Sequence, residues 1–130
     1  MTKRPFRFSV SGGEPVSAKA LAERARRAEG AGYSTFVLSD HLLNVHAPIP
    51  ALAAVATATE TLRIGMFVLN NDLRHPAVLA QELASLDVLS EGRLEIGIGA
   101  GGTSPSTPEA GSPSRPSRRA SRGSRNRSPC

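Results

Sequence analysis

Tryptophan is absent from this 130-residue chain, and aromatic residues make up only 4% of it. The single cysteine is Cys130, so no disulfide can form within one chain, which is typical of proteins in a reducing compartment. No apolar stretch approaches the roughly 18 residues of a membrane span. The apolar run after the basic N-terminus is too short for a signal peptide. These absences predict a cytoplasmic protein with no membrane partner.

Large apolar residues are also missing from residues 102–130, which contain no Leu, Ile, Val, Phe, Met or Tyr. This segment holds 8 Ser, 6 Arg, 5 Pro and 3 Gly, which are 22 of its 29 residues. Such a composition cannot bury enough apolar surface to offset the ordering of its backbone. We therefore divide the chain into a folded domain, residues 1–101, and a disordered tail, residues 102–130.

The positive charge of the chain belongs to this tail, which carries six Arg and one acid, whereas residues 1–101 carry ten basic and ten acidic residues. One interpretation is a basic arm that binds nucleic acid through charge alone, since it has no aromatic residues. The other is an out-of-frame read of a GC-rich gene, which yields mostly Ser, Pro, Arg, Gly and Ala. We favour the second, which the nucleotide sequence can decide, and do not expect nucleic acid as a partner.

Strand-like and helix-like segments alternate along residues 1–101. Short apolar strands are predicted at residues 6–10, 35–38, 62–69 and 94–98. Helices are predicted after the capping residue Ser17, from Pro50, and from Pro76 to Gly92. The apolar positions expected to face the core are Ala18, Leu21, Ala25, Ala28 and Gly32 in the first helix, Leu52, Val55, Ala56 and Thr59 in the second, and Leu79, Leu83, Leu86 and Leu89 in the third.

The strand centres are about 30 residues apart, which predicts right-handed βαβ units and a parallel sheet. Both a (β/α)8 barrel and a doubly wound sheet have this period. Each predicted strand runs into small or polar residues, at residues 11–13, 39–41, 70–72 and 99–101. Small or polar residues at all four strand ends favour the barrel, because the active sites of that fold lie at the carboxyl ends of its strands. In a doubly wound sheet only the ends at the switch point are expected to be functional. The predicted fold class is α/β, the N-terminal half of a (β/α)8 TIM barrel with four parallel strands.

A series of short motifs in this order resembles the luciferase-like monooxygenase superfamily, which includes flavin-dependent monooxygenases and coenzyme F420-dependent oxidoreductases. The resembling segments are residues 22–33, Ser39-Asp40-His41-Leu42, residues 62–65, Arg74-His75-Pro76-Ala77, residues 86–93 and residues 97–101. The resemblance implies a full barrel, of which four strands have no counterpart here. It also implies hydride transfer with F420 or flavin-dependent monooxygenation of a small organic substrate. A truncated, inactive chain is an open alternative.

Site residues follow from the resemblance. It places His41 near the reactive edge of the cofactor ring, whereas a histidine packed on the following loop is the structural alternative. Asp40 would hold the deazaflavin or orient His41, and its alternative is a turn or helix cap. These two are the predicted catalytic residues. The predicted cofactor-binding residues are Phe67, Val68, Leu69, Asn70, Gly99, Ala100 and Gly101.

Members of the family often have a bulge with a non-proline cis peptide at the position of Phe67-Val68-Leu69, although the residues alone indicate only a buried strand. Asn70 would present its amide to the cofactor or form the turn. F420 is the first choice of cofactor, because Ser39-Asp40-His41 is more similar to the F420 branch, and FMN is the second.

Other readings of these residues are weaker. The string from Gly97 to Gly102 matches G-x-G-x-x-G, but no helix is predicted to begin inside it, so a dinucleotide-binding turn is not expected. His41 and His46 have no convincing third ligand, so no metal site is predicted. Half a barrel leaves two sheet edges open, which predicts self-association.

Overall fold

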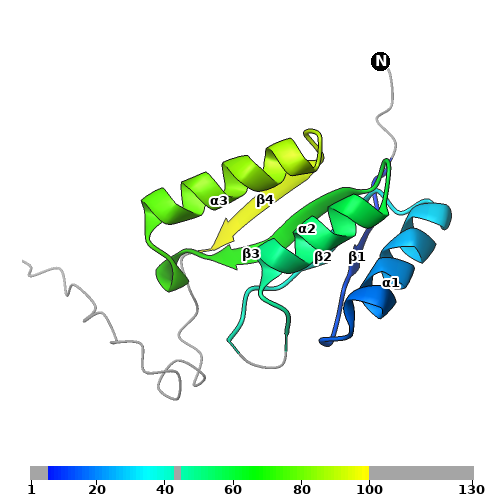
Figure 1. The fold of residues 1–130 in the computed structure, drawn as a ribbon, viewed down its shortest axis with the longest axis horizontal. Coiled ribbons are helices and arrows are strands. Elements are labelled where there is room, and N and C mark those ends of the chain that lie inside the picture. Colours follow the sequence, from blue (N-terminus) through cyan, green and yellow to red (C-terminus); the bar gives the residue numbers. More distant parts are fainter. Residues whose placement is uncertain (1–5, 43–44, 100–130) are drawn as a thin grey trace, which may run out of the picture.

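The computed structural model describes residues 6–42 and 45–99 (Figure 1). Ala100, Gly101 and the predicted tail lie outside these residues. In chain order the elements are β1 (Ser9–Ser11), α1 (Ala18–Gly30), β2 (Thr35–Leu38), α2 (Pro48–Ala58), β3 (Arg63–Asn70), a 3-10 turn η1 (Asn71–Leu73), α3 (Pro76–Leu89) and β4 (Leu94–Gly99).

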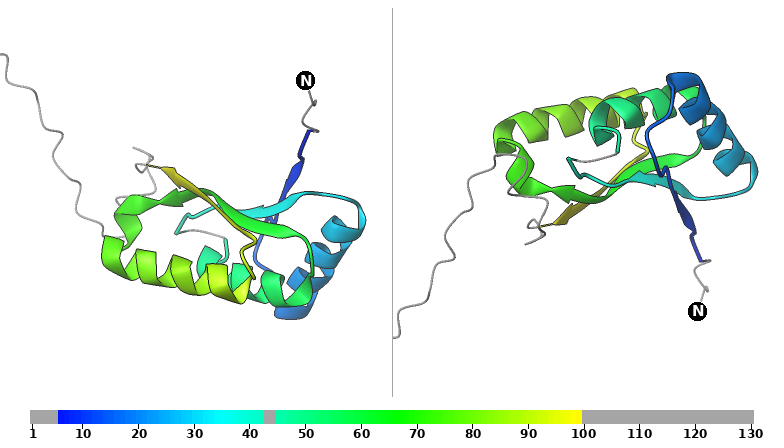
Figure 2. Two further views of the ribbon diagram at one scale, coloured as in Figure 1. Left: turned by 90° about the horizontal axis from the view of Figure 1, so that it is seen from above. Right: turned by 90° about the horizontal axis from the view of Figure 1, so that it is seen from below.

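The four strands form one sheet in the order β1-β2-β3-β4, and every neighbouring pair is parallel. The three α-helices all lie on one face of this sheet (Figure 2). A doubly wound sheet carries helices on both faces, whereas a barrel carries them only outside. The predicted fold class, four parallel strands with helices as in half of a (β/α)8 barrel, is therefore confirmed, and the structure makes the choice that the repeat period alone left open.

Helix α1 begins as predicted, because the Ser17 hydroxyl accepts a hydrogen bond from the amide of Ala20 at 3.3 Å. Of its predicted core positions Leu21, Ala25 and Ala28 are buried, whereas Ala18 and Gly32 at the two ends are exposed. The termini of a helix extend past the sheet that its middle covers, which explains the difference.

Helix α2 begins at Pro48, two residues before the predicted Pro50. Both prolines lie in the first turn, where the backbone N–H has no helical partner, so neither interrupts the helix. Its predicted inward residues are confirmed, since Leu52, Val55, Ala56 and Thr59 are all buried.

Helix α3 buries Leu79, Leu83 and Leu86, but the prediction for Leu89 is wrong, because its side chain is 63% exposed. At about 100° per residue, Leu89 is rotated roughly 80° away from Leu79 around the helix axis. Leu83, Leu86 and Leu89 are three residues apart, slightly less than one helical turn. Each step therefore rotates the leucine further from the core, and after Leu86 the side chain no longer faces it.

Strand β1 is shorter than predicted and begins at Ser9 instead of Phe6. Its partner β2 begins at Thr35, which pairs with Ser9, so Phe6 and Phe8 precede the start of the ladder. Both phenylalanines are exposed, by 92% and 67%. The predictions for residues 35–38, 62–69 and 94–98 agree with β2, β3 and β4 to within one residue.

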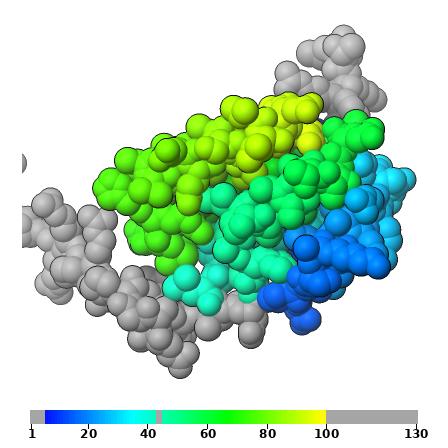
Figure 3. Space-filling model, in the orientation of Figure 1, coloured from blue at the N-terminus to red at the C-terminus, as the bar shows by residue number. Residues whose placement is uncertain are grey.

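The core lies between the sheet and the helices, which cover it side by side in Figure 3. Register aligns Phe36 with Ile64 and Ile64 with Leu94, and these side chains belong to the core. The intervening residues point to the opposite face. Among the described residues, no helix combines the length and the apolar character that crossing a bilayer requires.

Candidate functional site

Parallel strands bring the candidate residues to one edge of the sheet. Asp40 and His41 follow β2, Asn70 ends β3 and Gly99 ends β4. Because β2, β3 and β4 are neighbours with the same direction, these residues lie at adjacent strand ends. We call this edge the mouth.

The carboxylate of Asp40 is the most strongly held polar group at the mouth. Its side chain is 3% exposed, and Arg74 binds it through two hydrogen bonds, Nη1 to Oδ2 at 2.5 Å and Nη2 to Oδ1 at 3.1 Å. The backbone amide of Asn70 donates to Oδ2 at 3.0 Å. The hydrogen bond with Asp40 raises the pKa of Arg74 against the opposing effect of burial, so the guanidinium keeps its positive charge.

His41 lies next to this pair but is exposed to solvent. Within the described part of the chain no residue hydrogen-bonds its imidazole. The other two histidines have structural contacts. His46 accepts a hydrogen bond from the amide of Val16 at 2.9 Å, and His75 caps α3 by accepting from Ala77 at 3.3 Å. His41 is therefore the exposed histidine at the mouth whose ring has no hydrogen-bond partner among the described residues.

Strand β3 has a bulge beside the mouth, and the peptide bond between Phe67 and Val68 is cis. The pairing register between β3 and β4 shifts at the bulge, since Met66 pairs with Ile96 and Leu69 pairs with Ile98. Two residues of β3, Phe67 and Val68, therefore oppose one residue of β4. Phe67 is 75% exposed and Val68 43% exposed. Leu69 is fully buried in the core, its backbone included, so within the bulge only Phe67 and Val68 are exposed at the mouth.

Glycines of β4 make room for this bulge. A Cβ atom at Gly99 would lie 2.8 Å from Cγ2 of Val68, and one at Gly97 would lie 2.8 Å from the carbonyl oxygen of Met66. Any larger residue would displace the bulge. Asn70 forms the turn after β3, since its side-chain oxygen accepts from the amide of Asp72 at 3.0 Å. Ala100 and Gly101, also predicted to bind the cofactor, lie outside the described residues.

Arg74 is the residue at the mouth that sequence reasoning missed, because it was named only within the motif Arg74-His75-Pro76-Ala77 ahead of the predicted helix and was given no role at the site. The available signal was a pair of opposite charges at two predicted strand ends, Asp40 after the second strand and Arg74 after the third. Adjacent parallel strands bring such ends together, so the pairing follows from the topology.

A second charged cluster lies on the sheet face that faces away from the helices. Glu95 of β4 binds Arg7, Arg63 at 2.7 Å, and the hydroxyl of Thr35 at 3.0 Å. Burial opposes ionisation of Glu95, but the hydrogen bonds from these three residues outweigh it and lower its pKa. The cluster lies toward the amino ends of the strands, away from the mouth.

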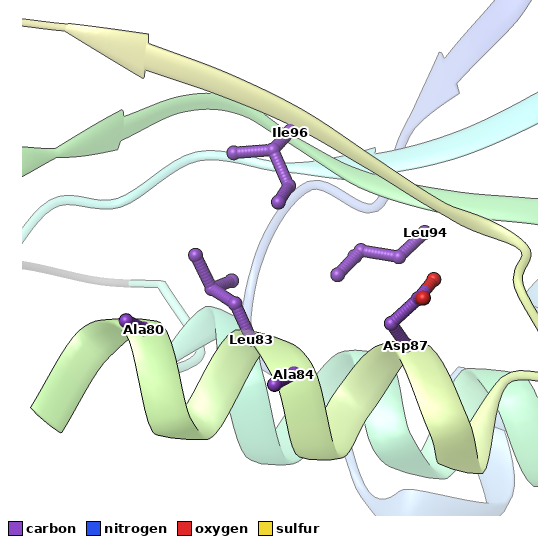
Figure 4. Close-up of a pocket in the computed structure, with 6 residues that line it drawn as sticks. All are labelled: Ala80, Leu83, Ala84, Asp87, Leu94 and Ile96. Carbon is purple, nitrogen blue, oxygen red and sulfur yellow. The ribbon is translucent and has the colours of Figure 1, made fainter.

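An open apolar groove lies between α3 and β4, with Ala80, Leu83, Ala84, Asp87, Leu94 and Ile96 around it (Figure 4). None of these is a predicted site residue, so the groove is separate from the candidate site. Among residues 6–42 and 45–99, no three His, Cys, Asp or Glu side chains are grouped so that they could hold a metal ion.

The sequence matches the luciferase-like monooxygenase family over residues 2–122. F420-dependent glucose-6-phosphate dehydrogenase of Nakamurella multipartita is 36% identical over 110 residues, which are 78% of this chain and 32% of that enzyme. The corresponding enzyme of Beutenbergia cavernae is 40% identical over 89 residues, 62% of this chain and 26% of that one. The match continues past Gly101, and the domain boundary placed there stays a prediction.

Solved structures give the same result. Coenzyme F420-dependent tetrahydromethanopterin reductase of Methanopyrus kandleri has a TM-score of 0.72 and 27% identity, covering 81% of this chain and 30% of that one. The FMN-bound oxygenating constituent of 3,6-diketocamphane monooxygenase from Pseudomonas putida has a TM-score of 0.69 at 23% identity, covering 81% and 32%, and is similar in fold. The chain spans about a third of the length of its relatives. It belongs to the luciferase-like monooxygenase family.

Proposed function

We propose that the chain is part of an oxidoreductase that transfers hydride to or from coenzyme F420. FMN-dependent monooxygenation of a small organic substrate is the alternative. The observation that carries the proposal is the pairing of an exposed histidine, His41, with the exposed apolar bulge Phe67–Val68 at neighbouring strand ends. The identity with F420-dependent dehydrogenases supports the choice of F420.

The described residues fit one face of a flat tricyclic ring. Phe67 and Val68 offer an apolar surface that is exposed to solvent, which is unusual for the middle of a buried barrel strand. Gly97 and Gly99 carry no side chain that would cover this surface. We propose that Phe67 and Val68 support the ring, that Leu69 holds this bulge in place from the core, and that Asn70, Gly99, Ala100 and Gly101 contact the edge of the ring.

His41 is the proposed catalytic group. The ring itself carries the electrons when it is bound. Imidazole is suited to holding or moving a proton near neutral pH, and the exposed ring of His41 leaves it open to a ligand at the mouth. Asp40 would then orient His41 instead of binding the ring, because its carboxylate already accepts three hydrogen bonds.

Cofactor titration tests the proposal. Fluorescence of F420 and of FMN would be followed while the full chain is added, and dissociation constants compared for wild type, His41→Ala and His75→Asn. We expect His41→Ala to weaken binding by about tenfold, as for one lost hydrogen bond. His75→Asn should leave binding unchanged, because Asn still caps α3. Failure of the wild-type chain to bind either cofactor would contradict the proposal.

We also propose that the chain associates with a second copy of itself through its open sheet edges. The groove between α3 and β4 is apolar, and beside it Ile96 and Ile98 are 49% and 60% exposed. Residues 102–130 contain none of the large apolar residues that pack on such a surface. The single cysteine supports a cytoplasmic location.

A further inference from the structure

The two charged groups at the mouth connect three elements. Asp40 follows β2, and Arg74 lies between η1 and α3. Their two hydrogen bonds join the carboxyl end of β2 to the start of α3, and the amide of Asn70 adds the end of β3. Arg74 is mostly buried, with 20% of its side chain exposed, so this connection is shielded from solvent.

The pair lies next to two parts of the proposed cofactor surface, His41 and the end of β3 that follows the bulge. Asp40 immediately precedes His41 in the chain. Asn70 lies two residues after Val68, whose peptide bond with Phe67 is cis. The same carboxylate therefore restrains the residue before the proposed catalytic histidine and the backbone that follows the bulge.

We propose that Arg74 is a positioning residue, which clamps Asp40 and thereby fixes His41 and the Phe67–Val68 bulge relative to each other. The inference rests on the function proposed above. It assigns Asp40 to this clamp, as the acceptor of Arg74, instead of to direct contact with the cofactor. A clamp of this kind needs the planar, two-pronged guanidinium, because an ammonium group cannot donate to both carboxylate oxygens in the same geometry.

Glu82 of α3 is the other acidic group near the clamp. Its negative charge contributes to the raised pKa of Arg74, and its Oε2 atom is buried without a hydrogen-bond partner in the structure. Glu82 does not form a salt bridge with Arg74 among the described residues. Asp40 is therefore the group that orients the guanidinium of Arg74, and Glu82 contributes only its negative charge, which helps to raise the pKa of Arg74.

The chain offers a matched control for Arg74. Arg93, just before β4, is also partly buried and donates to the carbonyl oxygens of Ala56 at 2.9 Å, Leu62 at 3.0 Å and Ser90 at 2.7 Å. Arg93 lies at the amino end of its strand, whereas Arg74 follows the carboxyl end of the neighbouring one. Loss of either arginine should lower stability, but only Arg74 should affect the mouth.

The test compares Arg74→Ala, Arg74→Lys and Arg93→Ala in the full chain. The first readout is the dissociation constant for F420 and FMN. We expect both Arg74 variants to weaken binding by about tenfold or more and Arg93→Ala to change it by less than about twofold. Arg74→Lys keeps the positive charge, so it remains informative if Arg74→Ala does not fold. Equal effects of the Arg74 and Arg93 variants on binding would overturn the inference.

The second readout needs no cofactor and separates this inference from the proposed function. Nuclear magnetic resonance would follow the backbone amide of Asn70 and the imidazole of His41. Both should shift in Arg74→Lys and stay unchanged in Arg93→Ala. If wild type binds no cofactor but these resonances shift, the proposed function fails and the clamp stands. If they do not shift in either Arg74 variant, the clamp is wrong.

Discussion

Individual carboxylates organise the connections between elements in this chain. The side chain of Glu29, near the end of α1, accepts hydrogen bonds through Oε1 from the backbone amides of Glu60, Thr61 and Leu62 at 2.6 to 2.9 Å. The hydroxyl of Thr61 donates to the same oxygen at 3.0 Å. One carboxylate thus holds the turn that leads from α2 into β3. Burial opposes its ionisation, but these hydrogen bonds dominate and lower the pKa of Glu29.

The stabilisation from Glu29 should depend on pH. Its folded-state pKa lies below the ordinary value of 4.5, so the stabilisation is present above that value and is lost as pH falls through the folded-state pKa. We expect Glu29→Gln to lower the free energy of unfolding by about 1–2 kcal/mol at neutral pH. In urea titrations this difference should shrink at about pH 3. A loss that is the same at both pH values would contradict the charge-based explanation, and Glu23→Gln on the exposed side of α1 is the control.

Arg93 should matter more for stability than any exposed arginine. Its guanidinium satisfies carbonyl oxygens at the end of α2 and at the start of β3, groups that would otherwise be buried without partners. We expect Arg93→Ala to lower the free energy of unfolding by about 2–3 kcal/mol, measured by urea titration. Arg26→Ala, which removes one exposed hydrogen bond to Ala58, should cost less than half as much. Equal losses in the two variants would refute this ranking.

At the scale of elements, the backbone requires glycine at the end of α3 but not at the end of α1. Gly92, after α3, has a φ of +76°, a conformation that side chains disfavour. Gly30 ends α1 without positive φ, and a Cβ atom there would meet nothing within 4 Å. The same substitution should therefore have opposite effects at the two positions.

Glycine-to-alanine substitutions test this difference. We expect Gly92→Ala to lower the free energy of unfolding by about 1–2 kcal/mol, because alanine is strained in the left-handed region. Gly30→Ala should raise it by about 0.5–1 kcal/mol, since alanine loses less backbone entropy in a helix. Thermal unfolding followed by circular dichroism measures both changes. Destabilisation by Gly30→Ala would indicate a close contact that the structure does not contain.

At the scale of the whole molecule, the described sheet is an open arc with β1 and β4 at its edges. Closed barrels leave no unpaired edge, so an open arc exposes backbone donors and acceptors as well as apolar side chains. The helix face has its own exposed apolar residues on α3, where Val88 is 78% exposed and Leu89 63% exposed. Self-association could therefore use either surface, and one experiment separates them.

Lysine substitutions at the two surfaces distinguish the interfaces. Ile98→Lys places a charge on the β4 edge, and Val88→Lys places one on the outer side of α3. If the edge carries the association, light scattering after gel filtration should show a shift toward monomer for Ile98→Lys only. Disruption by Val88→Lys alone would assign the contact to α3. A wild-type chain that is already monomeric would contradict the proposed association.

Much of the fold could be predicted because local patterns and chain topology agree. Alternation, helical spacing and the first-turn prolines located the three α-helices and the four strands of the described residues, and the polar strand ends indicated the mouth. The predicted start of β1 was wrong because a strand extends only as far as its partner β2 pairs with it. The local pattern of residues 6–8 does not reveal where β2 begins. The prediction that Leu89 faces the core was wrong because the spacing of leucines does not show how the helix is rotated relative to the sheet.

The sequence by itself determined the alternation of four strands with three helices, the capping of α1 by Ser17, and the change of composition at residue 102, because each depends on neighbours in the chain. The tertiary structure alone decided that the helices share one face and that Arg74 clamps Asp40. These features join residues 30 or more positions apart, so they exist only once parallel pairing has brought the strand ends together.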